Sequence, residues 1–255
     1  MICKICNNKS DELFSSKVLH KYDVKYYKCS SCGFVQTENP YWLNEAYGSA
    51  IGSPDIGLVS RNVYYAPIVS LIIKLVFNKN LSFLDFGGGY GIFVRLMRDR
   101  GFNFYRFDTY CKNMFAVGFD DDGKSSYELI TAFEVFEHLI DPMAEIETML
   151  KKSKNIFFST EIQPKNFSTE KDWWYVMPTS GQHISLYSMD ALKFISKKYN
   201  LNLYSNGRTF HLITEKNISP LLFKLAINRY TAKIINKLLK YPQSLLMKDF
   251  QEMLK

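Results

Sequence analysis

Short apolar runs alternate with stretches of helical spacing through the middle of the chain. The short runs, which we expect to be strands, lie at residues 81–86, 102–108, 127–133, 155–160, 201–204 and 209–214. Apolar residues at helical spacing predict helices at residues 63–77, 92–100, 142–152 and 189–199. Because strands that alternate with helices are typical of βαβ units, the pattern predicts an α/β fold with a doubly wound parallel sheet.

The two ends of the chain depart from this alternation. Residues 1–40 are polar, show little apolar periodicity and contain four of the five cysteines. Residues 219–255 alternate Leu, Ile and Phe with basic residues in a helical pattern. We therefore expect a small N-terminal module at 1–40, an α/β domain at 41–218 and a basic helical segment at 219–255. The chain has 255 residues, 47% of them hydrophobic, which is enough to bury one sizeable core beside a small module.

The N-terminal cysteines form two Cys-x-x-Cys pairs, Cys3 with Cys6 and Cys29 with Cys32, separated by 22 residues. Four thiolates in two such pairs suit tetrahedral Zn²⁺ and leave no open coordination position, so we expect a structural zinc site. A thioredoxin-like redox site would instead have one such pair beside a βαβ unit. The fifth cysteine, Cys111, is then an ordinary thiol.

A glycine-rich turn follows the first strand of the α/β region, in the sequence Asp85-Phe-Gly87-Gly88-Gly89-Tyr-Gly91. Glycine has no Cβ, so a ligand can approach the backbone and the N-terminus of the next helix closely. Asp108 ends the next strand, about 20 residues after the glycines, where a carboxylate can accept hydrogen bonds from both ribose hydroxyls. Together these features predict a bound nucleoside cofactor. The glycine spacing differs from the G-x-G-x-x-G of dinucleotide oxidoreductases.

These segments resemble those of the class I S-adenosylmethionine-dependent methyltransferases, which have a Rossmann-like sheet. The resemblance is carried by FLDFGGGYGIF at 83–93, by Asp108 and by LITAFEVFEHLIDP at 129–142. It implies that the chain binds S-adenosyl-L-methionine and transfers its methyl group.

The same resemblance implies roles for individual residues. Asp85 and the glycines are expected to contact the methionine moiety of the cofactor, Asp108 its ribose, and Phe119 and Asp120 its adenine. Glu134 directly follows the strand at 127–133, at the carboxyl edge of the sheet, where we expect it to line the cofactor.

A second resemblance concerns the segment QHISLYS at 182–188. It is similar to the E-H-x-S-x-F/Y-S element of bacterial nucleotide-sugar C-methyltransferases, which also carry an N-terminal zinc module with two Cys-x-x-Cys pairs. In that family a Tyr-x-Glu-His pattern supplies the His as general base. The corresponding residues here are Ser180, Gly181, Gln182 and His183. The resemblance therefore implies that His183 is the general base and that Gln182 contacts the substrate.

The phenol and the carboxylate of that pattern are absent from this sequence. Forming a carbanion beside a keto group demands more of a site than removing a proton from a hydroxyl. We therefore expect O-methylation of a nucleotide-activated sugar in the biosynthesis of capsular or other surface polysaccharide, with sugar C-methylation as the alternative. An RNA methyltransferase is disfavoured, because Glu134-Val-Phe-Glu137 stands where a base-holding Asn-Pro-Pro-Tyr motif would follow the strand.

Aromatic residues precede the candidate base, in the run Trp173-Trp174-Tyr175. Such rings can form a platform for a sugar or a nucleotide base, although large aromatic side chains commonly fill protein cores. We expect this run to contribute to substrate binding. His138, in the Glu-His-Leu turn at 137–139, is expected to be a packing and hydrogen-bonding element rather than a base.

The formal charge of +7 indicates an anionic partner, and a nucleotide-sugar substrate meets that requirement. Seven basic and two acidic residues lie in 219–255, so the charge does not require a nucleic-acid partner. No apolar run reaches the roughly 18 to 20 residues of a membrane span, and the N-terminus lacks the apolar stretch of a secretory signal. We therefore expect a cytoplasmic protein without a transmembrane segment. The basic helical segment is compatible with contact to a membrane surface. The sequence predicts no oligomeric state.

Overall fold

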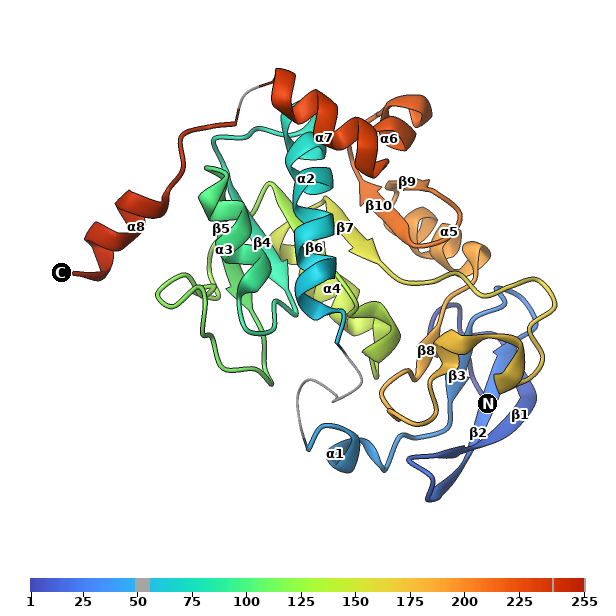
Figure 1. Ribbon diagram of the computed structural model, residues 1–255. Helices are drawn as coiled ribbons and strands as arrows, with labels where there is room; N and C mark the ends of the chain where they lie inside the picture. Colours follow the sequence, from blue (N-terminus) through green and yellow to red (C-terminus); the bar gives the residue numbers. More distant parts are fainter. Residues whose placement is uncertain (49–55, 240, 255) are drawn as a thin grey trace. The chain divides into compact units, whose positions relative to one another are not determined.

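The structure is a computed structural model that describes residues 1–48, 56–239 and 241–254 (Figure 1). The described chain separates into two compact units. We call the first the cysteine unit, which contains residues 1–48, 134–148 and 158–213. The second, the glycine-turn unit, contains residues 56–133, 149–157, 214–239 and 241–254. Both units combine segments that are distant in the sequence.

The expected strands form a six-stranded sheet in the order β5-β4-β6-β7-β10-β9. The strands are β4 Ser82–Phe86, β5 Asn103–Phe107, β6 Leu129–Ala132, β7 Ile156–Ser159, β9 Asn202–Ser205 and β10 Phe210–Thr214. β4 pairs in parallel with both β5 and β6. Because β4 comes first in sequence and lies between two later strands, the winding reverses there, which confirms the predicted doubly wound α/β arrangement. β9 and β10 are neighbours joined by only four residues, a connection that antiparallel strands allow, so the sheet is mixed rather than wholly parallel as expected.

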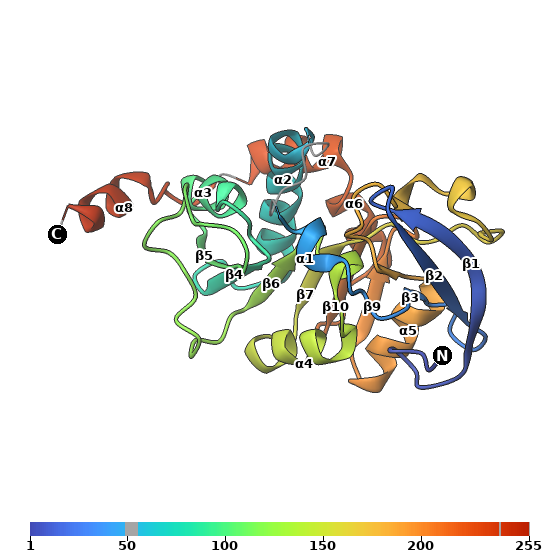
Figure 2. The ribbon, with the colours of Figure 1, turned by 90° about the horizontal axis from the view of Figure 1, so that it is seen from below.

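Five helices belong to the glycine-turn unit: α2 Leu58–Val76, α3 Ile92–Asp99, α6 Pro220–Ala226, α7 Arg229–Leu238 and α8 Leu246–Met253. Figure 2 shows α2 and α3 on the same side of strands β4, β5 and β6. α2 contacts α3, α6 and α7, and its central residues from Ala66 to Ile73 are buried. The core of this unit therefore lies around α2.

In the described part of the chain, α2 is the helix that is long and apolar enough to cross a membrane by length and composition. Half of its apolar window is buried inside the protein, against the helices that it contacts. This is the burial of a core helix. The sequence pattern placed the start of this helix at residue 63, whereas it begins at Leu58, so its full length was not predicted.

The C-terminal segment is helical as expected, but it forms three short helices instead of one. The Asn228 side chain starts α7 by accepting hydrogen bonds from the backbone N–H groups of Tyr230 and Thr231. α8 is held by Asp249, whose carboxylate accepts two hydrogen bonds from Arg98 of α3 at 2.6 and 2.8 Å and lies 2.9 Å from Arg95. These charged contacts attach the last described helix to the unit.

Residues 1–40 contain well-formed strands, which the weak apolar periodicity did not predict. β1 (Ser10–Val18) and β2 (Tyr22–Cys29) form an antiparallel hairpin, and β3 (Val35–Thr37) pairs with β2. β8 (Ser185–Leu186) completes a four-stranded sheet by pairing with β3. The N-terminal segment therefore shares a sheet with residues that directly follow the candidate base.

The same segments share a core within the cysteine unit. Val18, Tyr26 and Trp42 pack in one apolar cluster with Trp173 and Tyr175. Further elements are α1 Leu43–Ala46, the 3₁₀ helix η1 Phe136–His138, α4 Pro142–Lys152 and α5 Met189–Lys198. Of these, η1 carries His138, whose ring lies beside His183, and α1 carries Ala46, whose carbonyl bonds Gln182.

Candidate active site

The glycine turn lies between the end of β4 and the start of α3. Gly89 and Gly91 have φ values of 53° and 87°, in the left-handed region that favours glycine. A Cβ on Gly91 would lie 2.8 Å from the Asn113 side-chain oxygen and 3.0 Å from the Cβ of Ala116, whereas a Cβ on Gly89 would meet no atom within 4 Å. Gly91 thus allows the loop after β5 to pack closely, and Gly89 leaves open space beside its Cα that a ligand can enter.

Asp108 links this turn to the end of β5. Its carboxylate accepts hydrogen bonds from the backbone N–H groups of Gly89 at 2.9 Å, Tyr110 at 2.8 Å and Cys111 at 2.7 Å. The carboxylate therefore fixes the position of the glycine turn. It still has lone pairs that can accept hydrogen bonds from a ligand.

Asp85 is buried at the end of β4, where it accepts a hydrogen bond of 2.6 Å from the Thr131 hydroxyl of β6. Burial raises the pKa of Asp85 to about 7, although the Thr131 hydrogen bond opposes this shift. A Cβ on Gly88 would lie 2.9 Å from the Asp85 carboxylate, so the turn is folded directly over this residue. Asp85 therefore lies directly beneath the glycine turn.

Arg106 of β5 is a residue of this site that the sequence did not indicate. Its buried guanidinium donates to the Gly89 carbonyl and the Asp120 carboxylate, both at 2.6 Å, and to the Cys111 carbonyl. Asp120 also accepts a hydrogen bond of 2.9 Å from Asn113. Asp120 is thus brought to the glycine turn through an ion pair that orders the loop after β5.

Phe119, the neighbour of Asp120, has a buried side chain. The guanidinium carbon of Arg98 lies 3.6 Å from the centre of its ring. Its side chain therefore packs in the unit, while its backbone N–H donates to the Ala116 carbonyl at 3.0 Å and its carbonyl accepts from the Arg106 N–H at 2.8 Å.

Glu134 follows β6 with a φ of 55°, an unusual value for a residue with a side chain. Its backbone N–H donates to the Ser159 hydroxyl at 2.8 Å, and that hydroxyl donates to the Glu134 carboxylate at 2.6 Å. Strained backbone of this kind is concentrated at functional sites. The reciprocal bonds with Ser159 hold the carboxylate at the carboxyl edge of the sheet.

Two histidines meet within the cysteine unit. The rings of His138 and His183 are perpendicular, with centroids 5.0 Å apart. His183 Nδ1 lies 2.6 Å from the Tyr175 carbonyl oxygen, and His138 Nδ1 lies 3.1 Å from that of Gln182. Because a carbonyl oxygen only accepts hydrogen bonds, Nδ1 of His183 carries the proton, and Nε2 of its neutral ring has a lone pair that can accept one. Nδ1 of His138 also lies 3.2 Å from the Tyr47 hydroxyl.

Burial keeps both rings neutral. It lowers the pKa of His183 to about 4 and that of His138 to about 3. The nearby His183 adds to the shift of His138. Each ring is therefore neutral, with one nitrogen able to accept a proton, over the whole neutral range of pH.

Glu137 lies beside these rings and is fully buried, with 0% of its surface exposed. Neither carboxylate oxygen has a hydrogen-bond partner among the described residues, and one of them lies 4.0 Å from His138 Nε2. Burial, helped by the charge of Glu134, raises the pKa of Glu137 to about 8. Glu137, His138 and His183 each offer a ligand atom within 4.8 Å of the others, so the group can hold either a proton or a cation.

Segments near the N-terminus position the candidate base. The Trp42 indole N–H donates to the Gly181 carbonyl at 2.8 Å, and the Gln182 side-chain amide donates to the Ala46 carbonyl at 2.8 Å. Gly181 has a φ of 65°, and a Cβ there would lie 3.0 Å from a methyl carbon of Val18. Gln182, expected to contact substrate, thus has its side-chain amide bonded to α1, while its backbone carbonyl orients His138.

The three aromatic residues of the predicted platform have different environments. Trp173 is buried in the apolar cluster of the cysteine unit, and the ring of Tyr175 packs against His183 with centroids 4.6 Å apart. Trp174 is 66% exposed. Of the three, Trp174 is the residue that presents its ring to solvent.

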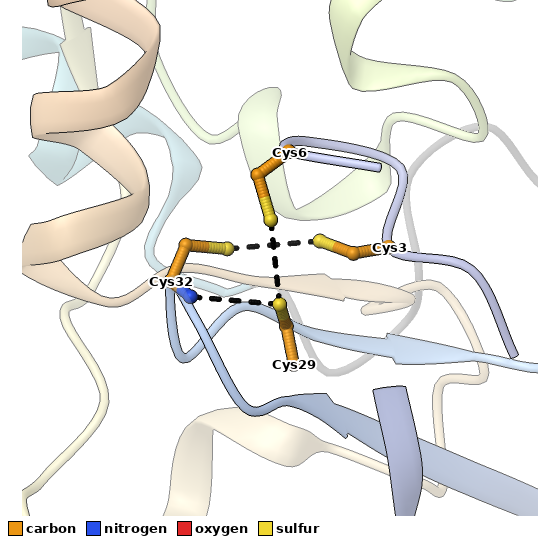
Figure 3. Close-up of side chains that lie close together, drawn as sticks. All are labelled: Cys3, Cys6, Cys29 and Cys32. Carbon is orange, nitrogen blue, oxygen red and sulfur yellow. Dashed lines mark hydrogen bonds between the residues drawn. The ribbon is translucent and has the colours of Figure 1, made fainter. Parts of the chain in front are cut away.

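The four N-terminal cysteines converge, as Figure 3 shows. The Sγ atoms of Cys3 and Cys32 are 3.6 Å apart and those of Cys6 and Cys29 are 3.4 Å apart. With Zn–S bonds of about 2.3 Å, a tetrahedral site has sulfur atoms separated by roughly 3.8 Å, so the donor set fits one zinc ion. Backbone N–H groups of Ile5 and Cys32 point at Cys3 and Cys29, as required to stabilise thiolates.

The fold and the glycine-turn unit define the class of protein. A doubly wound sheet, a glycine turn after its first strand and a carboxylate at the end of the next strand are typical of domains that bind a nucleoside cofactor at the switch point of the sheet.

A family model described as "Methyltransferase domain" matches residues 61–206, more than half of the chain. The chain therefore belongs to this family of S-adenosylmethionine-dependent methyltransferases. A search of curated protein sequences found no match.

Solved structures with similar folds include several methyltransferases. TnmH is 13% identical with a TM-score of 0.48, over 69% of this chain and 61% of its own. CalO1, a methyltransferase in calicheamicin biosynthesis solved with SAH, is 12% identical with a TM-score of 0.43, over 69% of this chain and 60% of its own. An O-methyltransferase family protein from Burkholderia thailandensis is 10% identical with a TM-score of 0.45, over 71% of this chain and 69% of its own. The chain spans less than two thirds of the first two structures, and such low similarity does not identify a substrate.

Sequence reasoning did not predict the grouping of Glu137 and His138 with His183. The segment with Glu137 and His138 lies more than 40 residues before the segment with His183. The two are joined by contacts of the Gln182 carbonyl with His138 Nδ1 and of the Ile184 N–H with the Glu137 carbonyl. Both histidines stood out in the sequence, but only the tertiary fold shows that they are neighbours.

Proposed function

We propose that this methyltransferase transfers a methyl group to a hydroxyl of a nucleotide-activated sugar, with His183 as general base. The observation that carries the proposal is the tautomer of His183. Its Nδ1–H is used by the Tyr175 carbonyl, so Nε2 is the atom that can accept a proton. The neighbour His138 is neutral, so it adds no positive charge that would oppose the imidazolium formed in the reaction.

S-adenosyl-L-methionine fits the residues of the glycine turn. The cofactor supplies an activated methyl group on sulfur. Asp85 and the glycines, Gly89 above all, are proposed to hold its methionine moiety, and Asp108 to accept hydrogen bonds from the ribose hydroxyls. Asp120 and its neighbour Phe119 are proposed to lie beside the adenine, and Glu134 to line the site.

A sulfonium needs little help as a leaving group, so the chain must mainly align the acceptor and remove its proton. One neutral imidazole suffices for a hydroxyl, whose proton leaves as the new bond to carbon forms. The alternative, methylation at a sugar carbon, requires a carbanion, and no carboxylate stands at position 182 to support its formation. This difference favours O-methylation.

The sugar nucleotide is proposed from the resemblance of the segment around His183 to sugar methyltransferases. The exposed ring of Trp174 offers a surface for a sugar or a base, and the net charge of +7 suits a pyrophosphate. A role in capsular or other surface polysaccharide biosynthesis in the cytoplasm follows from that substrate class. The cysteine cluster is proposed to hold a structural zinc ion that supports the sheet in which β8 pairs with β3.

Product analysis tests this function. Purified protein and S-adenosyl-L-methionine are incubated with a panel of nucleotide sugars and with RNA, and products are analysed by mass spectrometry and NMR. We expect the mass of one added methylene on a nucleotide sugar and the NMR signals of a methyl ether. A C-methyl signal would support the alternative, and a methylated RNA with unmodified sugars would refute the proposal.

A further inference from the structure

An exposed apolar stripe runs along α7. Tyr230, Ile234 and Leu238 are spaced by four residues, so they lie along one side of the helix. Their side chains are 74%, 61% and 77% exposed. Isolated exposed apolar residues are common, but three on one helical stripe form a surface that usually meets a partner.

Contacts with α2 determine which way this stripe faces. Ala232 and Asn236 are the buried residues of α7. The Asn236 amide donates to the Pro67 carbonyl at 2.7 Å and accepts from Lys74 at 3.0 Å, both on α2. Two positions along a helix correspond to a rotation of about 200°, so Ile234 lies on the side opposite both buried residues. The stripe therefore faces away from α2, because turning it inward would expose Ala232 and Asn236.

The neighbourhood of the stripe is basic. The segment from Lys216 to Lys248, both included, contains seven basic residues and no acidic residue. Lys224, Arg229, Lys233 and Lys237 are exposed, and Lys233 and Lys237 are within one turn of Ile234. On α6, Leu221 and Leu225 are exposed as well. Apolar side chains beside long cationic ones are typical of helices that lie in the interface of an anionic membrane.

We propose that the exposed face of α6 and α7 docks this enzyme on an anionic lipid surface. Tyr230, Ile234 and Leu238 enter the headgroup region, and the flanking cations bind lipid phosphates. The charge decides against a second copy of the chain, because the same face on two copies would bring like charges together with no carboxylate to offset them. This docking site is independent of His183 and goes beyond the proposed transfer reaction.

Vesicle co-sedimentation tests the proposal. The full chain is mixed with vesicles of phosphatidylcholine and phosphatidylglycerol, or of phosphatidylcholine alone. We expect binding to the anionic vesicles only. Replacing Lys233 and Lys237 by Gln should weaken binding by about fivefold per lysine, on the order of 25-fold for the pair. I234S with L238S should weaken it by roughly tenfold per residue, with an unchanged melting temperature because both side chains are exposed.

A matched control replaces Lys154 and Lys165, exposed lysines outside these helices, by Gln, and we expect unchanged binding. Absence of binding to anionic vesicles, or equal loss in the control, would overturn the proposal. Sedimentation velocity of the same proteins adds a second readout. A dimer that I234S with L238S converts to monomer would assign the face to self-association instead. Methyl transfer to a soluble acceptor does not depend on these variants, so failure of docking and failure of the proposed reaction are distinguishable.

Discussion

Asp108→Asn tests whether the carboxylate that orders the glycine turn also binds the cofactor. The carboxylate accepts three backbone hydrogen bonds, from Gly89 on one oxygen and from Tyr110 and Cys111 on the other. An Asn side chain has the same shape, but one oxygen becomes an amide group that can only donate. In either orientation the variant turns a donor toward at least one backbone N–H.

The structure sets the size of the expected effect. A hydrogen bond to a charged group contributes about 1.5–3 kcal/mol, and losing one weakens binding by about 10- to 100-fold. We therefore expect Asp108→Asn to raise the Kd for S-adenosylmethionine by that factor, because a ribose hydroxyl loses a charged acceptor and the turn loses an anchor. Titration calorimetry measures the change directly.

Asp122→Asn is the matched control for this experiment. Asp122 is also an exposed-loop carboxylate that accepts backbone hydrogen bonds, from Lys124 at 2.9 Å and Ser125 at 2.8 Å, but it does not contact the glycine turn. We expect the Kd of Asp122→Asn for S-adenosylmethionine to equal that of the wild type. An unchanged Kd in Asp108→Asn, or an equal loss in Asp122→Asn, would refute the reasoning.

Three further predictions concern stability and metal content. Asp249→Asn removes the negative charge that is paired with the buried Arg98. We therefore expect either a loss of about 3 kcal/mol in the free energy of unfolding or rapid proteolysis near Pro242 as α8 detaches. Unfolding free energy and resistance to proteolysis equal to those of the wild type would contradict this. The pKa of Asp85 is about 7 in the folded wild type, against an ordinary value of 3.8. As the pH rises, the unfolded chain therefore loses the Asp85 proton before the folded protein does. The free energy of unfolding should fall as the pH rises from about 4 to 7. When measured by urea unfolding at each pH, the stability of Asp85→Asn should lack this decline. Identical pH profiles of wild type and variant would show that burial does not raise the pKa of Asp85. Cys32→Ser should lose bound zinc and lower the melting temperature, whereas Cys111→Ser should keep both at wild-type values, as metal analysis and calorimetry can check.

Local patterns were sufficient to predict much of the α/β region. The strands β4 to β7 and helix α4 agree with the apolar runs and helical spacing, because each buries a continuous face that leaves a clear periodic signal. The glycine turn and Asp108 were also found where the motif placed them. Their signal is local, since a turn and the end of a strand are specified by neighbouring residues.

Non-local pairing accounts for what the sequence did not predict. The β1–β2 hairpin is rich in polar residues, and its register is set by partners such as Phe14 opposite Tyr26 rather than by strict alternation. β3 pairs with β8 across about 150 residues, and this pairing helps place the segment that carries His183. The ion pair of Arg106 with Asp120 and the meeting of His138 with His183 likewise depend on tertiary contacts, which no short motif encodes.

The most direct test of the account follows a labelled methyl group from S-adenosylmethionine. Wild type and His183→Ala are each saturated with the labelled cofactor and mixed with the nucleotide sugars, and label on the acceptor is measured over time. The account predicts transfer to a sugar hydroxyl by wild type, and no transfer by His183→Ala although its cofactor Kd is unchanged. Full transfer by His183→Ala would contradict the role of its imidazole, and absence of transfer by wild type to every nucleotide sugar would contradict the proposed substrate class.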